Sequence, residues 1–110
     1  MLKIENYVNG ELLEPVSGRY LDNYNPATGQ IYSLFPDSDE RDVEAAVESA
    51  RAAFPIWSRM SAEARHDHLM RVSALIERDS DALAEAESAD NGKPKSLARQ
   101  VDIPRAVSNF

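Results

Sequence analysis

The sequence has 110 residues, of which 43% are hydrophobic and 28% are charged, and its formal net charge at pH 7 is -7. A chain of this length forms one small domain at most, and its acidic balance without a basic stripe argues against binding to nucleic acid or anionic membranes. The absence of cysteine excludes disulfide bonds, thiolate metal ligands and thiol nucleophiles. Because no signal peptide and no bilayer-spanning apolar run is found either, we expect a cytoplasmic protein.

The first third of the sequence is predicted to form short strands joined by tight turns. Asn9-Gly10 separates two short β-prone segments and favours a type I′ hairpin, because both turn residues need a positive φ angle. Residues 20–24 alternate apolar and polar side chains, and residues 30–35 form another β-rich run. Residues 25–29, Asn-Pro-Ala-Thr-Gly, are typical of the turn between them. We expect two antiparallel hairpins or a short meander.

Helical periodicity begins after Pro36. Ser38 or Asp39 can cap a first helix, and acidic residues in its first turn suit the positive end of the helix dipole. Apolar residues then recur at helical spacing, and we expect this helix to fray and end at Pro55. The apolar stripe consists of Val43, Ala46, Val47, Ala50, Phe54 and Trp57.

A second helix is predicted to begin at Ser61, which can serve as its N-cap. Asp79-Ser80 either interrupts this helix or caps a continuation of it, and Gly92 provides a left-handed stop. The buried face of the second helix is expected to contain Leu69, Val72 and Ile76.

A third helix is predicted to begin near Ser96. Pro104 either kinks this helix or restarts it, in which case Asp102 is the new cap. The helical pattern continues to Phe110 without a cap or a polar tail, so we expect the sequence to be part of a longer chain. The apolar residues near this end have few predicted partners, and we expect self-association through them. They are Leu97, Val101, Val107 and Phe110.

Together these segments predict an α+β fold. Residues 1–36 form the strand and hairpin region, and residues 37–110 form a helical region with about three helices.

No group of side chains predicts an active site. His66 and His68, the only histidines, would point to different faces of one helix and cannot bind one metal ion together. The acidic residues 37–42 lack the glycine and the spaced glutamate of a calcium loop. Asn91-Gly92-Lys93 lacks the rest of a phosphate-binding loop, and no Gly-x-Gly-x-x-Gly dinucleotide motif occurs. No catalytic residue and no cofactor-binding residue is therefore assigned in this chain.

Six motifs nevertheless follow one another in a specific order over nearly the whole chain. Their succession resembles the start of the aldehyde dehydrogenase superfamily. They are Tyr7-Val8-Asn9-Gly10-Glu11, Asn25-Pro26-Ala27-Thr28-Gly29, Asp42-Val43 to Phe54 with Trp57, Arg65 with Leu69 and Ile76, Leu83-Ala84, and Glu87-Ser88-Ala89-Asp90-Asn91-Gly92-Lys93-Pro94. The last residues, 97–110, resemble the branch that oxidises 2-hydroxymuconic and 2-aminomuconic semialdehydes.

The resemblance implies a larger α/β enzyme, of which residues 1–110 form the N-terminal portion of the Rossmann-type cofactor domain. It implies oxidation of a small aldehyde to the carboxylic acid with NAD or NADP, through a cysteine thiolate and a glutamate-activated water. In the family the catalytic cysteine and glutamate lie downstream of the segment that this sequence matches. The catalytic domain is therefore absent from these residues, and we expect the chain alone to be inactive.

The resemblance also implies a structural Na⁺ or K⁺ ion. In the family, backbone carbonyls before Asn-Pro and the acid of an Asp-x-Gly-Lys motif bind this ion. The matching ligands are the carbonyls of Asn23 and Tyr24 and the carboxylate of Asp90, and hard oxygen donors suit such an ion. The alternative is that Asp90 interacts only with the helix stop at Gly92.

Two further functional hypotheses remain open at this stage. One is a stand-alone interaction or oligomerisation module derived from the same family. The other is a small acidic binding domain, unrelated to catalysis, whose match to the motifs is accidental.

Overall fold

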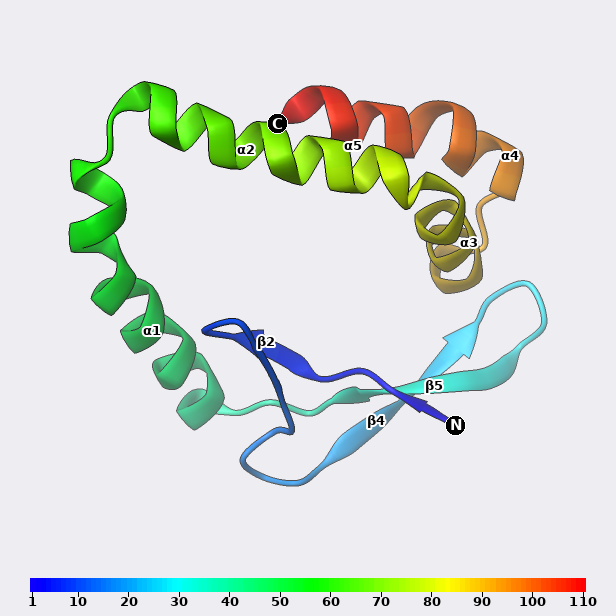
Figure 1. Ribbon diagram of the computed structural model, residues 1–110. Helices are drawn as coiled ribbons and strands as arrows, with labels where there is room; N and C mark the ends of the chain where they lie inside the picture. The colour runs from blue at the N-terminus through cyan, green and yellow to red at the C-terminus, as the bar shows by residue number, and fades with distance from the viewer. The chain divides into compact units, whose positions relative to one another are not determined.

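The computed structural model describes residues 1–110, which divide into two compact units (Figure 1). The strand unit consists of Met1–Tyr24 and Gln30–Arg59, and the helical unit consists of Asn25–Gly29 and Met60–Phe110. All strands precede all helices in the chain, which confirms the α+β prediction. The elements are β1 (Leu2–Lys3), β2 (Asn6–Val8), β3 (Glu11–Leu13), β4 (Tyr20–Asn25), β5 (Gln30–Pro36), α1 (Glu40–Arg59), α2 (Ala62–Arg78), α3 (Ser80–Asn91), α4 (Lys95–Leu97), the π-helix η1 (Ala98–Asp102) and α5 (Ile103–Asn109).

The strands form two small sheets, one with the order β1-β5-β4 and one containing β2 and β3. The β2–β3 hairpin is antiparallel, and Asn9 (φ 54°) and Gly10 (φ 81°) both have the positive φ angles predicted for its turn. β1 instead pairs in parallel with β5, with Leu2 opposite Ser33. Sequence patterning did not predict β1, because this pairing joins segments far apart in the sequence.

Helix α1 begins with a reciprocal pair of caps. The Asp39 carboxylate accepts a hydrogen bond from the Arg41 N–H (3.0 Å), while the Asp39 N–H donates to the Asp42 carboxylate (2.9 Å). Of the two predicted caps the structure selects Asp39, since the Ser38 hydroxyl pairs with the Asn6 side chain instead. The hydrogen bond from the Arg41 guanidinium lowers the pKa of Asp39 from 3.8 to about 2.

The end of α1 differs from the prediction. Pro55 lies inside the helix, which continues to Arg59. A proline removes one backbone hydrogen bond at a cost of about 3 kcal/mol, but the apolar periodicity runs on to Trp57, and the helix continues with it. No residue of α1 is buried.

In the helical unit, the start of α2 and the end of α3 lie where the sequence predicts them. The Ser61 hydroxyl caps α2 by accepting a hydrogen bond from the Ala64 N–H (3.1 Å). Asp79 ends α2 and α3 follows as a separate helix, so the predicted interruption is confirmed, whereas Asp79 makes no side-chain cap for α3. Gly92 ends α3 in the left-handed conformation.

Helices α2 and α5 lie side by side (Figure 1). The buried Ser73 hydroxyl of α2 donates a hydrogen bond to the Val107 carbonyl of α5 (2.7 Å). The small apolar core of this unit consists of Ala84, Ala98 and Ile103, with Ile76 packed against it.

A π-helical turn connects α4 to α5. The Ile103 N–H donates to the Ala98 carbonyl five residues back, and Pro104, which has no N–H, follows in the first turn of α5. The predicted restart at Pro104 was wrong, because Ala98, Asp102 and Ile103 all keep right-handed helical backbone angles and the helix continues through this turn. The predicted cap was wrong, because Asp102 makes no side-chain cap and its carboxylate binds Lys93. The wider turn lets both Ala98 and Ile103 be buried.

Candidate functional site

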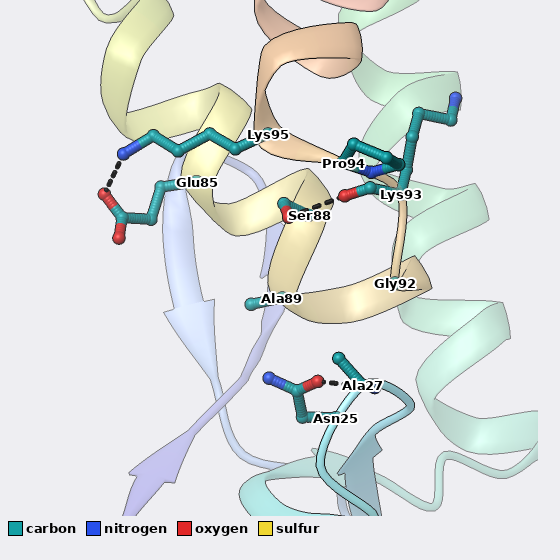
Figure 2. A pocket seen from close by; sticks show the side chains of 9 residues that line it. All are labelled: Asn25, Ala27, Glu85, Ser88, Ala89, Gly92, Lys93, Pro94 and Lys95. Atoms are coloured by element: carbon teal, nitrogen blue, oxygen red, sulfur yellow. Dashed lines mark hydrogen bonds and ion pairs between the residues drawn. The ribbon is translucent and has the colours of Figure 1, made fainter.

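In the helical unit, a hollow lies between the turn Asn25–Gly29 and the C-terminal end of α3 (Figure 2). Its volume is about 390 Å³, and it opens to solvent. Two of the six motifs of the sequence resemblance, Asn-Pro-Ala-Thr-Gly and the segment around Gly92, meet here. The lining residues are Asn25, Ala27, Glu85, Ser88, Ala89, Gly92, Lys93, Pro94 and Lys95.

The turn Asn25–Gly29 is held by its own first residue. The Asn25 side-chain oxygen accepts a hydrogen bond from the Ala27 N–H (2.9 Å), and the Asn25 backbone carbonyl accepts one from the Gly29 N–H (2.8 Å). Gly29 has a φ angle of 69°, which glycine adopts without strain. These contacts fix the position of Pro26 within the turn.

Gly92 is the point at which α3 meets this turn. Its φ angle is 77°, and a Cβ atom built on it would lie 2.9 Å from Cγ of Pro26. Both the backbone conformation and the close approach of a proline ring therefore require a residue without a side chain. Glycine at this position serves packing as well as the helix stop.

The segment after α3 is tied back to the helix through two hydrogen bonds, and a third within the helix orients Asn91. The Ser88 hydroxyl donates to the Lys93 carbonyl (2.6 Å), and the Asn91 side-chain oxygen accepts from the Lys93 N–H (2.8 Å). The other end of the Asn91 amide donates to the Glu87 carboxylate (2.6 Å). This loop is thus fixed by side chains of the helix that it leaves.

Two ion pairs complete the arrangement. Lys93 Nζ lies 2.6 Å from the Asp102 carboxylate, and both side chains are partly buried. Lys95 Nζ lies 2.8 Å from the exposed Glu85 carboxylate, and this hydrogen bond lowers the pKa of Glu85 (Figure 2). The charged groups around the hollow therefore pair with one another.

The contacts around the hollow connect the turn, the end of α3 and the segment that follows it. The hydroxyl and charged groups of the hollow already have protein partners, and it contains no thiol and no histidine. The common dinucleotide-binding motif is a glycine-rich turn between a strand and a helix whose N–H groups face the phosphates. Gly92 follows a helix and its N–H donates to the Ser88 carbonyl. The hollow thus does not contain this motif.

The residues predicted to bind a monovalent cation lie on two elements, β4 and α3. Asn23 and Tyr24 are in β4, where the Asn23 amide donates to the Tyr32 hydroxyl (3.0 Å) and the Ser33 hydroxyl (3.1 Å). Asp90 is in the last turn of α3 and has interaction partners there. Asn23 and Tyr24 belong to the strand unit and Asp90 to the helical unit. The cation site stays a prediction.

The other metal candidates take no part in a cluster. His66 lies beside Asp67 (3.4 Å), whereas His68 lies beside Arg71 (3.0 Å). No group of three or more histidine, cysteine, aspartate or glutamate side chains is placed to hold a metal ion.

None of the helices is long and apolar enough to span a lipid bilayer.

Sequence reasoning missed two of the contacts that build the hollow. It assigned Gly92 to the helix stop alone and did not foresee Pro26 against it. It assigned Asp102 to a helix cap rather than to Lys93. Both contacts join segments that are separated in the sequence. Their only indication in the sequence is that each of these residues lies in or near one of the six family motifs.

Comparison with known proteins gives the family. The family model described as "Aldehyde dehydrogenase family" matches residues 13–110. The chain is 50% identical over 110 residues to 2-aminomuconic semialdehyde dehydrogenase of Bos taurus, with all of this chain and 22% of that protein covered. It is 41% identical over 111 residues to 2-hydroxymuconic semialdehyde dehydrogenase of Pseudomonas sp. (strain CF600), covering 100% of this chain and 23% of that protein.

Solved structures give the same result. The NAD⁺ complex of aldehyde dehydrogenase from Bacillus cereus superposes with a TM-score of 0.93 at 35% identity, covering 97% of this chain and 22% of that chain. The chain thus spans about a fifth of the length of the relatives that it matches. On the sequence motifs, the fold and these matches, the chain belongs to the aldehyde dehydrogenase family.

Proposed function

We propose that these residues form the N-terminal part of the cofactor domain of an NAD(P)-dependent aldehyde dehydrogenase, and that alone they do not oxidise aldehydes. The first support is the family match over residues 13–110 together with the coverage of only 22% of a relative. The second is chemical: the family's reaction uses a cysteine thiolate, and this chain contains no cysteine. The chain therefore contributes structure to a reaction whose catalytic groups lie elsewhere.

The observation that carries this proposal is the uncovered apolar surface of α1. This helix has 20 residues and buries none of them, although a surface helix normally buries one apolar stripe against a core. Val47, Phe54 and Trp57 lie on its predicted stripe and are all exposed. We infer that further sequence of an aldehyde dehydrogenase packs against this stripe.

The substrate class that we propose is a semialdehyde. Two relatives with identities of 50% and 41% are named as 2-aminomuconic and 2-hydroxymuconic semialdehyde dehydrogenases. For the cofactor we propose NAD, because a structural relative was solved as an NAD⁺ complex. We place both sites outside these 110 residues, because the residues that line the hollow near Gly92 include no thiol and no histidine.

The test is to titrate the purified 110-residue chain with NAD⁺ by calorimetry, and to follow NADH absorbance with an aldehyde present. The proposal expects neither binding nor turnover. Binding without turnover would show that a cofactor pocket exists within these residues and would contradict the assignment of NAD to the rest of the enzyme. Turnover would contradict the cysteine mechanism, because the chain has no thiol.

A second candidate function is an interaction module that associates through exposed apolar helix faces. It is favoured by the same surface on α1 and by the exposure of Leu97, Val101 and Phe110 near the other end. Sedimentation velocity over a range of concentrations tests the module. A monomer at high concentration eliminates it and leaves the enzyme-segment proposal intact, whereas a defined dimer supports association through these faces, which both candidates allow.

A further inference from the structure

The sequence contains two Asn-Gly dipeptides, Asn9-Gly10 and Asn91-Gly92, in different structural settings. We propose that Asn9 is a site of spontaneous deamidation and isomerisation, and that the fold protects Asn91 from the same reaction. The proposal concerns a covalent modification and is independent of the proposed enzyme function.

The reaction needs only the chain and water. The backbone nitrogen of the residue after asparagine loses its proton and attacks Cγ, which closes a succinimide ring. The Cγ–Nδ2 bond breaks, and ammonia leaves with the released proton. Water then adds to either ring carbonyl, so that one C–N bond opens and either aspartate or isoaspartate remains. Glycine as the following residue leaves this nitrogen accessible, because it has no Cβ atom.

Asn9 is exposed at a turn with few restraints. Its side chain makes no hydrogen bond, and no backbone hydrogen bond engages the Gly10 N–H in the turn. Gly10 has no heavy atom from beyond its chain neighbours within 4 Å of the position of a Cβ atom, so no packed contact holds this residue.

The hairpin around Asn9 also opens easily. β2 and β3 form a two-stranded sheet with three residue pairs, and every residue of β3 is exposed. A two-stranded hairpin of this kind is marginally stable on its own. Local opening therefore gives Asn9 the backbone freedom that ring closure requires.

Asn91 is also followed by a glycine, but its side chain and the glycine N–H are both hydrogen-bonded. The Gly92 N–H, which would be the nucleophile, donates to the Ser88 carbonyl (3.0 Å). Both ends of the Asn91 amide are bound, one to the Glu87 carboxylate and one to the Lys93 N–H. Pro26 also lies against Gly92, so rotation of this peptide group would disturb a packed contact. The helix end must open before ring closure can begin.

Modification at Asn9 would change the strand unit. Either product adds a negative charge to a chain whose net charge is already -7. Isoaspartate in addition lengthens the backbone by one atom, which a two-residue type I′ turn cannot accommodate without losing its strand register. The Asn6 side chain in β2 then loses its aligned contact with Ser38 (2.8 Å).

The experiment incubates the full 110-residue chain at mildly alkaline pH and physiological temperature, and follows both asparagines by peptide mapping with mass spectrometry. Isoaspartate is quantified separately by enzymatic methyl transfer. A parallel incubation in concentrated guanidinium chloride removes the fold but keeps both dipeptides. The variant Asn9→Ala identifies the peptide that carries the fast reaction.

In the native chain we expect Asn9 to react at least about tenfold faster than Asn91, because opening a two-stranded hairpin costs less free energy than opening a hydrogen-bonded helix end. In guanidinium chloride the two rates are expected to converge, and Asn9→Ala is expected to abolish the fast native reaction. Equal native rates, faster reaction at Asn91, or a native difference that persists after unfolding would overturn the proposal.

Discussion

The strand unit and the helical unit differ in how much of their own surface they bury. The helical unit contains all three buried apolar residues of the core, Ala84, Ala98 and Ile103. The strand unit buries only Pro15 and Ser33, and its long helix α1 buries nothing. The helical unit therefore holds its helices together within these residues, whereas α1 presents a stripe that needs a partner. The following predictions test this contrast.

The largest expected effect is from truncating the core of the helical unit. Ile103→Ala removes a side chain that is 9% exposed and is expected to lower the free energy of unfolding by about 2–4 kcal/mol. The matched change in α1 is Val47→Ala, whose side chain is 47% exposed, and it is expected to cost less than about 0.5 kcal/mol.

Urea denaturation of both variants measures this difference directly. Similar losses in the two variants would contradict the assignment of the stabilising core to the helical unit.

A second effect concerns the contact between Gly92 and Pro26. Gly92→Ala combines an unfavourable φ angle with a Cβ atom 2.9 Å from Pro26 Cγ, and we expect a loss of about 2–3 kcal/mol. Gly29→Ala is the control, since Gly29 has a similar φ of 69° but open space around it, and about 1 kcal/mol is expected there. Thermal unfolding of both variants measures the difference, and equal losses would show that the Pro26 contact contributes nothing.

A smaller effect is expected where α2 meets α5. Ser73→Ala removes a buried hydroxyl that donates to the Val107 carbonyl and should cost about 1 kcal/mol. Ser108→Ala removes an exposed hydroxyl with a similar backbone partner, the Arg105 carbonyl, and should leave stability nearly unchanged. Chemical denaturation of both variants measures this difference in stability. An unchanged midpoint for Ser73→Ala would contradict the role of this hydrogen bond in joining the two helices.

The smallest expected effect on stability is in the strand unit, where Asp39 caps α1. The pKa of Asp39 is lowered from 3.8 to about 2 by its hydrogen bonds to Arg41. Because the folded pKa lies below the ordinary value, the contribution of Asp39 is complete above pH 3.8 and is lost as the pH falls towards 2. An NMR titration of the Asp39 carboxyl carbon measures this pKa, and a midpoint at the ordinary value would show that the cap does not form.

The features that the sequence predicted are those fixed by neighbouring residues. The Asn9-Gly10 turn, the Ser61 cap and the Gly92 stop each depend on the backbone preferences of one or two residues. The resemblance to a family supplied the remaining prediction, namely that the chemistry lies outside the chain.

The features that it did not predict depend on contacts between distant segments. The parallel pairing of β1 with β5 and the Lys93–Asp102 ion pair cannot be read from local periodicity. Local propensity predicts a helix end at Pro55, whereas the apolar stripe continues past it and the helix runs on to Arg59. In the hollow, the sequence predicts the helix stop at Gly92 but not the contact between Gly92 and Pro26.

The central claim is that these residues supply structure to an aldehyde dehydrogenase and no catalytic group. A hybrid enzyme tests it most directly: these 110 residues replace the matching segment of the Bos taurus semialdehyde dehydrogenase, and NADH formation is measured with the semialdehyde named for that enzyme. The account predicts that the hybrid folds and turns over its substrate, since the catalytic groups come from the remaining sequence. A folded hybrid that binds NAD⁺ but forms no NADH would contradict it, because a catalytic group would then have been lost with the replaced segment.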